Sequence, residues 1–244
     1  MNAVLFALPL LLAASPPPRT PVLVELFTSE GCSSCPSADN ALARLAQRQP
    51  VEGVELIALG FHVDYWDFLG WKDPYSSAEY SERQRRYALD GDDNRVYTPQ
   101  MVVDGERAFV GGEDEARTQA AAAAQRAKVP LRLTARVDGE SVVVRVRTET
   151  APAPGLELWA ALAEEGLSTD VKRGENAGKK LAHAAVVRTL ATLPVAKASE
   201  GGFVSEARLK LSPGWKREKL RVVAVLQAPG GPVSGVAAVE LASK

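Results

Sequence analysis

The two cysteines of this 244-residue chain, Cys32 and Cys35, are three positions apart and are followed directly by Pro36. Residues three apart in a regular helix have Cβ atoms roughly 5–6 Å apart, whereas a disulfide requires about 3.5–4.5 Å, so the pair must lie at a helix edge. Proline is tolerated in the first helical turn, which places the helix start near Cys35 and leaves Cys32 just before it, more exposed. Backbone N–H groups and the helix dipole stabilise a thiolate there, so the spacing predicts a redox-active dithiol.

The chemistry that such a pair predicts is thiol-disulfide exchange with the thiols or disulfides of a protein or peptide. Cys32 attacks a disulfide, and Cys35 resolves the mixed disulfide that forms. One alternative is a non-catalytic interaction module with a structural disulfide, although closing so short a loop stabilises a fold little. Another is a thiol peroxidase, which forms a sulfenic acid at Cys32 and consumes peroxide.

The same cysteines define a metal alternative. A structural zinc site has four ligands, and Cys32, Cys35 and His62 leave it one short. Copper(I) accepts fewer and softer ligands, so a copper-binding or copper-delivery protein that uses these three residues remains an alternative. The exchange hypothesis itself requires no metal and no other cofactor.

The elements that must position the cysteines follow from hydrophobic periodicity. Two apolar runs, 22–28 and 54–61, predict buried strands, and helical spacing of apolar residues predicts a helix between them that ends near Gln49. A capping box at 76–79 opens a helix that reaches about Tyr87. The predicted order of the first half is strand 22–28, helix 35–49, strand 54–61, helix 76–87, a hairpin over 101–110 around Asp104-Gly105, and helix 113–128.

From Val129 onward, helical periodicity is replaced by short strands and turn signals. The predicted strands are 131–137, 141–148, 156–163, 186–190, 203–211, 220–227 and 233–241. This pattern predicts an antiparallel β-sandwich. We therefore expect three parts: a signal peptide and leader over 1–18, an α/β domain over 19–128, and an all-β domain over 129–244.

Composition and the N-terminal segment limit the classes of partner. The 29 basic and 30 acidic residues are interspersed and give a net charge of −1, which argues against nucleic acid and acidic lipid. Residues 1–18 carry no charged side chain and contain a short apolar run followed by small residues, as in a signal peptide. The run is shorter than the about 20 residues of a spanning helix, so we expect export without membrane insertion of the mature chain.

An aromatic loop, residues 62–74, follows the second predicted strand. We expect it to form the rim of the site, with substrate-binding side chains from His62, Asp64, Tyr65, Trp66 and Trp71. The plainer reading is that the aromatic residues form the loop's own small core and that His62 is held by ordinary hydrogen bonds.

A second polar group, Glu175, Asn176 and His183, lies in the β-rich half. We interpret the Gly-Glu-Asn-Ala-Gly run there as a turn that needs glycine at positive φ.

Four segments together resemble one family, the secreted thioredoxin-like proteins catalogued as domain of unknown function 1223. They are VELFTSEGCSSCPSAD (24–39), FHVDYWDFLGWKDPYSS (61–77), VYTPQMVVDG (96–105) and RGENAGKKLAHAAVVR (173–188). The resemblance covers most of the chain after residue 18. It implies an exported bacterial protein, periplasmic or secreted, with a thioredoxin-like N-terminal domain and a β domain, but it implies no substrate.

The resemblance to the thioredoxin fold also implies roles for individual residues. Thr98-Pro99 stands immediately before the third predicted strand, where that fold keeps a cis-proline beside its catalytic cysteines. Glu25 is the possible buried proton acceptor, although it precedes Cys32 by seven positions where the fold's acid precedes by six. Ser33 and Ser34 replace the usual Gly-Pro pair, so the redox potential does not carry over.

Overall fold

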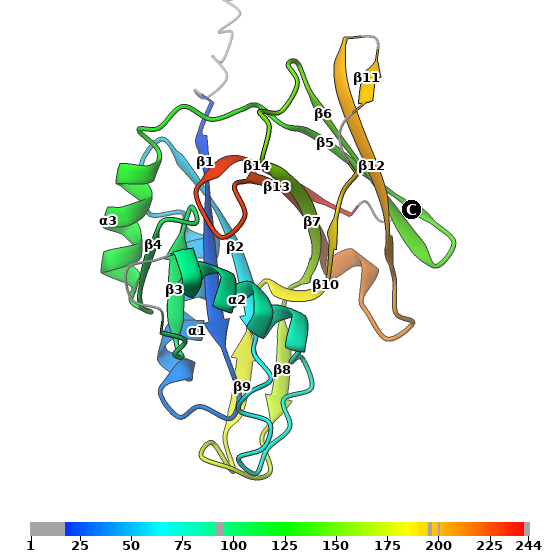
Figure 1. Ribbon diagram of the computed structural model, residues 1–244. Helices are drawn as coiled ribbons and strands as arrows, with labels where there is room; N and C mark the ends of the chain where they lie inside the picture. Colours follow the sequence, from blue (N-terminus) through cyan, green and yellow to red (C-terminus); the bar gives the residue numbers. More distant parts are fainter. Residues whose placement is uncertain (1–17, 91–94, 195–196, 200, 242–244) are drawn as a thin grey trace, which may run out of the picture.

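The computed structural model describes residues 18–90, 95–194, 197–199 and 201–241 and shows a mixed α/β protein built around one large sheet (Figure 1). The sheet has eight strands, a second sheet has four, and a two-stranded hairpin projects from the large sheet (Figure 1). The predicted signal peptide lies outside the described residues apart from Pro18.

The strands of the first half form where the apolar runs predicted them. They are β1 (Thr20–Thr28), β2 (Val54–His62), β3 (Gln100–Val103) and β4 (Arg107–Val110). β1 pairs in parallel with β2 and antiparallel with β3, which pairs antiparallel with β4. The predicted turn between β3 and β4 is confirmed, because Asp104 and Gly105 both have positive φ, 50° and 72°.

Three helices accompany these strands: α1 (Cys35–Arg48), α2 (Ala78–Asp90) and α3 (Glu113–Ala123). α1 begins at Cys35 with Pro36 in its first turn and ends at a left-handed Gln49, as predicted. The N-terminal cap of α2 differs from the expected box, because Ser77 Oγ accepts the Glu79 N–H at 3.2 Å. No helix within the described ranges is both long and apolar enough to cross a membrane.

The second half supplies ten strands. They are β5 (Arg132–Asp138), β6 (Ser141–Thr148), β7 (Glu157–Glu164), β8 (Leu167–Asp170), β9 (Lys180–His183), β10 (Val186–Thr192), β11 (Lys197–Ser199), β12 (Gly202–Lys210), β13 (Leu220–Gln227) and β14 (Val233–Glu240). All seven predicted strands are present. The sequence analysis missed β8, β9 and β11, which have three or four residues each, and the short 3₁₀ helix Arg217–Lys219.

The large sheet joins the two halves of the chain, which the sequence analysis did not predict. Its strand order is β14-β13-β7-β10-β2-β1-β3-β4. β10 lies parallel to β2, and the Gly60 N–H donates to Ala185 O at 2.8 Å, so the free edge of β2 gains a partner from the second half. The sheet therefore crosses the boundary expected at residue 129, and the β-rich half is not a separate sandwich.

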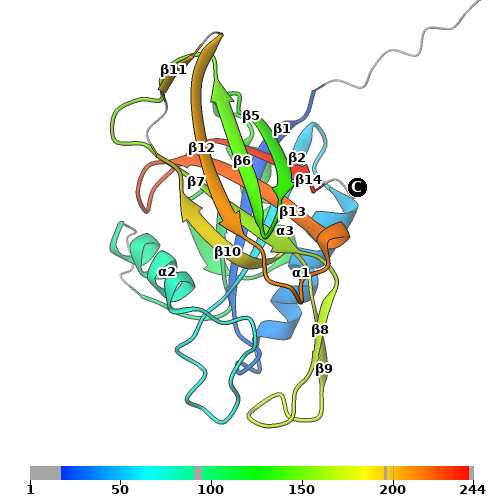
Figure 2. The same ribbon diagram turned by 90° about the vertical axis from the view of Figure 1, so that its right-hand side faces the viewer.

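Layers on both faces bury the large sheet (Figure 2). α1 and α3 pack on the face that carries Val24 and Leu26 of β1, whereas α2 packs on the face that carries Leu23 and Phe27. The sheet β11-β12-β6-β5 covers β7 and β13 and encloses a third apolar core. Alternating residues of β1 thus face different helices, which decides what each side chain near the cysteines can reach.

Candidate functional site

The cysteines lie on a tight loop between the end of β1 and the start of α1. The Cys32 N–H donates to Ser29 O and the Cys35 N–H to Cys32 O, both at 3.2 Å. Both cysteines are free thiols in this structure. Cys32 is 2% exposed and Cys35 is fully buried, so the order of exposure is as predicted but Cys32 is far less exposed than expected. The Thr98-Pro99 segment contributes to this burial, because Thr98 O lies 3.8 Å from the Cys32 sulfur.

The two thiols differ in acidity because their surroundings differ. A hydrogen bond from the Cys35 thiol lowers the pKa of Cys32 to about 6. Burial opposes this shift, whereas Thr98 and the backbone of Ser34 and Cys35 add to it. Burial, followed by the neighbouring Cys32 sulfur, raises the pKa of Cys35. At neutral pH this arrangement holds Cys32 as the thiolate and Cys35 as the thiol.

The Thr98-Pro99 segment lies against the Cys32 sulfur. The Thr98-Pro99 peptide bond is cis, and the Cys32 Sγ lies 3.8 Å from Thr98 O. The Trp66 Nε1–H donates to Thr98 Oγ1 at 2.8 Å, and Trp66 Cβ also packs on Gly31. These contacts join the aromatic loop, the cysteine loop and the segment before β3 at one point.

The other expected rim residues take different positions. Tyr65 is half-buried beside the cysteines and donates to Gln84 Oε1 at 3.1 Å, and burial raises its pKa to about 12. Asp64 turns away, because its carboxylate and backbone N–H bind Ser81 of α2. Trp71 donates from Nε1 to Glu30 Oε2 at 2.8 Å and so anchors the loop from below. Among the expected rim residues, Tyr65 and Trp66 therefore lie on the side of the cysteines.

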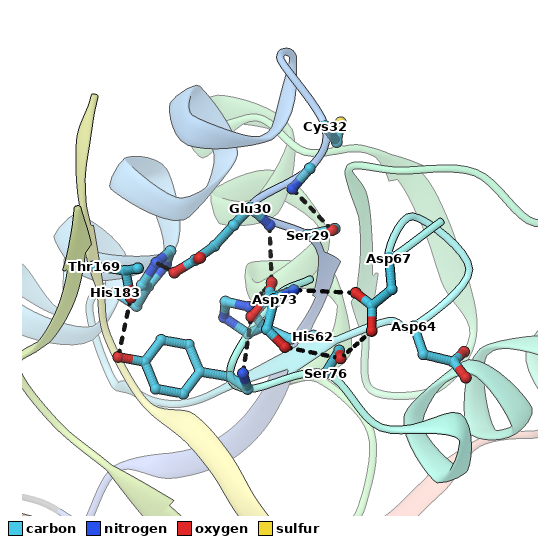
Figure 3. Close-up of polar contacts among 12 residues, drawn as sticks. Ser29, Glu30, Cys32, His62, Asp64, Asp67, Asp73, Ser76, Thr169 and His183 are labelled. Atoms are coloured by element: carbon cyan, nitrogen blue, oxygen red, sulfur yellow. Dashed lines mark hydrogen bonds and ion pairs between the residues drawn. The ribbon is translucent and has the colours of Figure 1, made fainter. Parts of the chain in front are cut away.

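His62 belongs to a buried polar cluster beneath the cysteine loop rather than to the rim (Figure 3). Its Nδ1 lies 2.7 Å from Asp73 Oδ2, which also accepts the Glu30 N–H at 2.8 Å. Glu30 Oε1 in turn lies 3.0 Å from His183 Nε2, and the two imidazole rings meet edge to face with centroids 4.7 Å apart. The two histidines of the chain, 121 positions apart, thus meet behind the cysteines.

The pKa shifts within this cluster reflect a competition between burial and neighbouring charges. Burial opposes the charged form of His62, but Asp73 outweighs it and raises the pKa of His62. Burial likewise opposes the Asp73 carboxylate, yet His62 and the Glu30 and Tyr75 backbone N–H groups lower the pKa of Asp73. Burial raises the pKa of Asp39 on α1, against the pull of both histidines. His62 is therefore held by hydrogen bonds, which is the plainer of its two readings.

The loop of the β8–β9 hairpin contacts the cysteine loop directly. Asn176 is fully buried, and its Nδ2 donates to Glu30 O at 2.8 Å and to Cys32 O at 2.9 Å. Glu175 Oε2 accepts the Ser33 N–H at 2.9 Å. Gly174 and Gly178 do have positive φ, as the turn reading requires, but the turn also presents Glu175 and Asn176 to the cysteines.

Glu25 does not lie where a proton acceptor for the cysteines would. Its side chain is on the α2 face of β1, where its carboxylate accepts from Arg83 Nε at 2.7 Å and from the Tyr87 hydroxyl. α1 covers the opposite face. The seven-residue spacing to Cys32 reverses the face relative to a six-residue spacing, because strand residues alternate. The expected role of Glu25 is corrected on this ground.

The copper alternative gains no further metal ligands from the described part of the structure. Within the described ranges, no group of three or more His, Cys, Asp or Glu side chains is arranged to hold a metal ion. The His62 Nδ1 is bound to Asp73, so we derive no step through a metal from Cys32, Cys35 and His62.

Three site residues escaped sequence reasoning, Glu30, Asp39 and Asp73, and a fourth, Asn176, was interpreted only as part of a turn. Glu30 stands two positions before Cys32, and Asp39 stands four after Cys35, on the same side of α1. Those spacings were a usable signal. Asp73 and Asn176 reach the site from distant segments, and only their dense neighbourhood of glycine and aromatic residues marked them.

Comparisons with known proteins agree with the extent of this fold. A protein of Agrobacterium tumefaciens with an X-ray structure is 26% identical and superposes with a TM-score of 0.70, covering 94% of this chain and 98% of that one. A superoxide reductase in the oxidised state is 12% identical, with a TM-score of 0.24 and coverage of 48% of this chain and 91% of that one, which is too distant to support any argument. No curated protein matches the sequence. The profile of the family described as "Protein of unknown function (DUF1223)" matches residues 23–227, and the chain belongs to that family.

Proposed function

We propose that the protein is a thiol-disulfide oxidoreductase with a thioredoxin-like site. The observation that carries this proposal is the placement of Cys32 and Cys35 at the N-terminus of α1, with the Cys32 sulfur 3.8 Å from Thr98 O of the cis Thr98-Pro99 segment. The unequal acidity of the two thiols supports it, because exchange needs a thiolate that attacks and a second thiol held in reserve.

The topology around the cysteines supports the thioredoxin-like part of the proposal. Within the large sheet, β2-β1-β3-β4 has a parallel central pair followed by an antiparallel hairpin, with α1 and α3 on one face and α2 on the other. The dithiol stands at the first strand-to-helix junction and the cis-proline stands before β3. Strands β10, β7, β13 and β14 extend this unit, and the sheet β11-β12-β6-β5 packs on the extension.

The reaction proceeds by two displacements at sulfur. The Cys32 thiolate attacks one sulfur of a substrate disulfide, a Cys32–substrate bond forms, and the other substrate sulfur leaves as a thiolate. Cys35 then gives up its proton and attacks the Cys32 sulfur, which closes the Cys32–Cys35 disulfide and releases the second substrate thiolate. The substrate is reduced by two electrons and the protein is oxidised by two. The reverse sequence oxidises a substrate dithiol.

The rim supports a polypeptide as the substrate. Cys32 is 2% exposed and lies against Thr98, whose Oγ1 accepts from Trp66, so a substrate that docks here meets these residues beside the sulfur. Thr98 offers backbone next to the sulfur, and Tyr65 and Trp66 offer apolar surface. We extend the proposal to export: the composition of residues 1–18 favours a periplasmic or secreted protein, in an oxidising compartment where such exchange operates.

The decisive experiment measures the dithiol/disulfide equilibrium of the purified protein in graded glutathione buffers, with Cys32→Ser and Cys35→Ser as variants. We expect a potential at or above about −270 mV, within the range of known exchange catalysts. Cys35→Ser should accumulate a mixed disulfide with a model peptide, because the resolving thiol is gone, and Cys32→Ser should not.

Other outcomes separate the alternatives. A potential below about −300 mV with no trapped species, as for a structural disulfide, overturns the proposal. Stoichiometric copper(I) binding by the reduced protein alone, without exchange, would move the assignment to copper handling. Peroxide consumption with a sulfenic acid at Cys32 would move it to a peroxidase.

A further inference from the structure

The loop between β8 and β9 reaches across the molecule to the redox loop. It comes from the second half of the chain, 142 positions after the residue that Glu175 contacts and 144 after the Cys32 carbonyl that Asn176 contacts. Both side chains bind main-chain groups of the segment Glu30–Ser33, and the Glu175 carboxylate also interacts with the Ser33 side chain. Contacts of this kind fix the conformation of a loop whatever side chains the loop itself carries.

Asn176 supplies the rigid part of this contact. One amide nitrogen donates to two carbonyls, Glu30 O at 2.8 Å and Cys32 O at 2.9 Å, while Lys179 Nζ donates to the amide oxygen at 2.9 Å. The side chain is fully buried, so water does not compete for these groups. Asn176 therefore holds the Cys32 backbone at a fixed position relative to α1.

Glu175 supplies the charge. Its carboxylate accepts the Ser33 N–H at 2.9 Å, just before the N-terminus of α1, and is exposed to solvent. The same helix end stabilises the Cys32 thiolate through the Ser34 and Cys35 backbone. A carboxylate and a thiolate thus share one helix terminus, and like charges at one site disfavour each other.

From this geometry we propose that the β8–β9 hairpin tunes the redox site: Asn176 positions the cysteine loop, and the Glu175 charge shifts the dithiol/disulfide equilibrium toward the disulfide. The inference rests on the proposed exchange function. Closing the disulfide from the Cys32 thiolate and the Cys35 thiol removes two electrons and one proton from the cysteines, and with them the thiolate charge at Cys32. The Glu175 carboxylate repels the Cys32 thiolate of the reduced form, whereas the disulfide of the oxidised form has no charge to repel. Glu175 therefore makes the protein a stronger reductant.

Other charged groups near this end of the molecule contribute to the electrostatic environment of the cysteines. Glu30 and Asp39 lie beneath the loop, His62 and His183 face them, and Lys179 lies within the hairpin. A substitution that changes only Glu175 leaves these groups in place.

The test compares Glu175→Gln with Asp170→Asn in the full chain. Glutamine keeps an oxygen that can accept the Ser33 N–H and removes the charge. Asp170, an exposed acid on β8 of the same hairpin, provides the matched control. Thiolate formation is followed against pH by ultraviolet absorbance, and the equilibrium constant with glutathione is measured for each protein.

We expect Glu175→Gln to lower the pKa of Cys32 by about half a unit, the effect of one exposed charge several ångströms away. The glutathione equilibrium should move toward the dithiol by about threefold, equivalent to about 15 mV in potential. Asp170→Asn should match the unmodified protein in both measurements.

Two results overturn the inference while leaving exchange intact: Glu175→Gln that matches the unmodified protein, or Asp170→Asn that shifts as far as Glu175→Gln. The failure of exchange looks different, because then the unmodified protein neither titrates near pH 6 nor equilibrates with glutathione. Far-ultraviolet circular dichroism of each variant verifies that the fold is retained.

Discussion

Glu25 and Glu30 are two buried glutamates near the end of β1, and their carboxylates contact different kinds of side chain. Glu25 forms an ion pair with Arg83 Nε at 2.7 Å and accepts the Tyr87 hydroxyl, and the Arg83 guanidinium stacks 4.0 Å from the Trp159 ring centroid. Glu30 accepts from Trp71 at 2.8 Å and lies 3.0 Å from His183. Both carboxylates are buried, yet only Glu30 belongs to the segment that leads into the cysteine loop.

The difference between the two clusters lies in the partner that each carboxylate has. Burial works against the Arg83 charge, but Glu25 outweighs it and raises the pKa of Arg83. The Glu30 cluster contains imidazoles, whose charge changes near neutral pH. We infer that the Glu25 cluster holds α2 to the sheet, whereas the Glu30 cluster joins the cysteine loop, the aromatic loop and the β8–β9 hairpin.

The largest expected effect follows from breaking the Glu25 pair. Arg83→Met leaves the Glu25 carboxylate buried without its cation, and the free energy of unfolding should fall by about 3–5 kcal/mol. The pKa of Cys32 and its rate of alkylation should stay unchanged, because this cluster faces away from α1. Urea unfolding and pH-dependent alkylation measure the two quantities.

A double variant sharpens that result. Arg83→Met with Glu25→Gln removes both charges, so much of the lost stability should return. If Arg83→Met also alters Cys32 reactivity in the folded protein, the separation of the two clusters is wrong.

The next effect concerns the Glu30 side of the comparison. Asn176→Ala leaves the carbonyls of Glu30 and Cys32 without this donor, and the free energy of unfolding should fall by about 1–3 kcal/mol. Here the Cys32 alkylation rate should change together with stability, in contrast to Arg83→Met. Ala177→Gly is the control at the neighbouring position. A stability loss in Asn176→Ala without any change at Cys32 would contradict a positioning role.

The smallest effect is a dependence on pH. The raised pKa of His62 stabilises the fold below about pH 6.5, and this contribution is lost as the pH rises through the folded-state pKa. The lowered pKa of Asp73 stabilises the fold above about pH 4 and is lost as the pH falls. His62→Gln keeps a hydrogen-bonding group. The loss in free energy of unfolding that it causes should be greatest between about pH 4 and pH 6.5, and it should shrink by on the order of 1 kcal/mol at higher pH.

Tyr87→Phe is the matched control in the Glu25 cluster. Burial raises the pKa of Tyr87 well above 10, so its hydroxyl does not titrate between pH 5 and 8. Its cost should be about 1 kcal/mol and independent of pH over that range. A pH-dependent cost for Tyr87→Phe, or a flat cost for His62→Gln, would remove the distinction between the clusters. Denaturant midpoints at several pH values measure both.

Local sequence predicted most of the secondary structure. The start of α1 followed from Cys35 and Pro36, and the turn at Asp104-Gly105 followed from its residue types. Strands β8 and β9 were missed because each has four residues with alternating exposure, too few for a periodic signal. The position of β10 beside β2 depends on a pairing 126 positions apart, at Val186 and Gly60, which no local pattern encodes.

Only those features of the site that lie within a single segment could be predicted. Spacing placed the cysteines at the helix start. It could not assign Glu25 to the face opposite α1, because the sequence alone does not say which face of the sheet α1 covers. The glycines around Asn176 were read correctly as a turn. What that turn touches depends on the tertiary fold, so its role in the site was missed.

The contact between Asn176 and the Cys32 carbonyl also orders events during synthesis. The cysteines emerge from the ribosome 144 residues before the side chain that fixes their loop. At about 5–20 residues per second, that interval lasts roughly 7–30 s. A nascent chain therefore carries its two thiols before the hairpin that completes their surroundings exists, and the loop that holds the cysteines gains its final contacts only after Asn176 has been added.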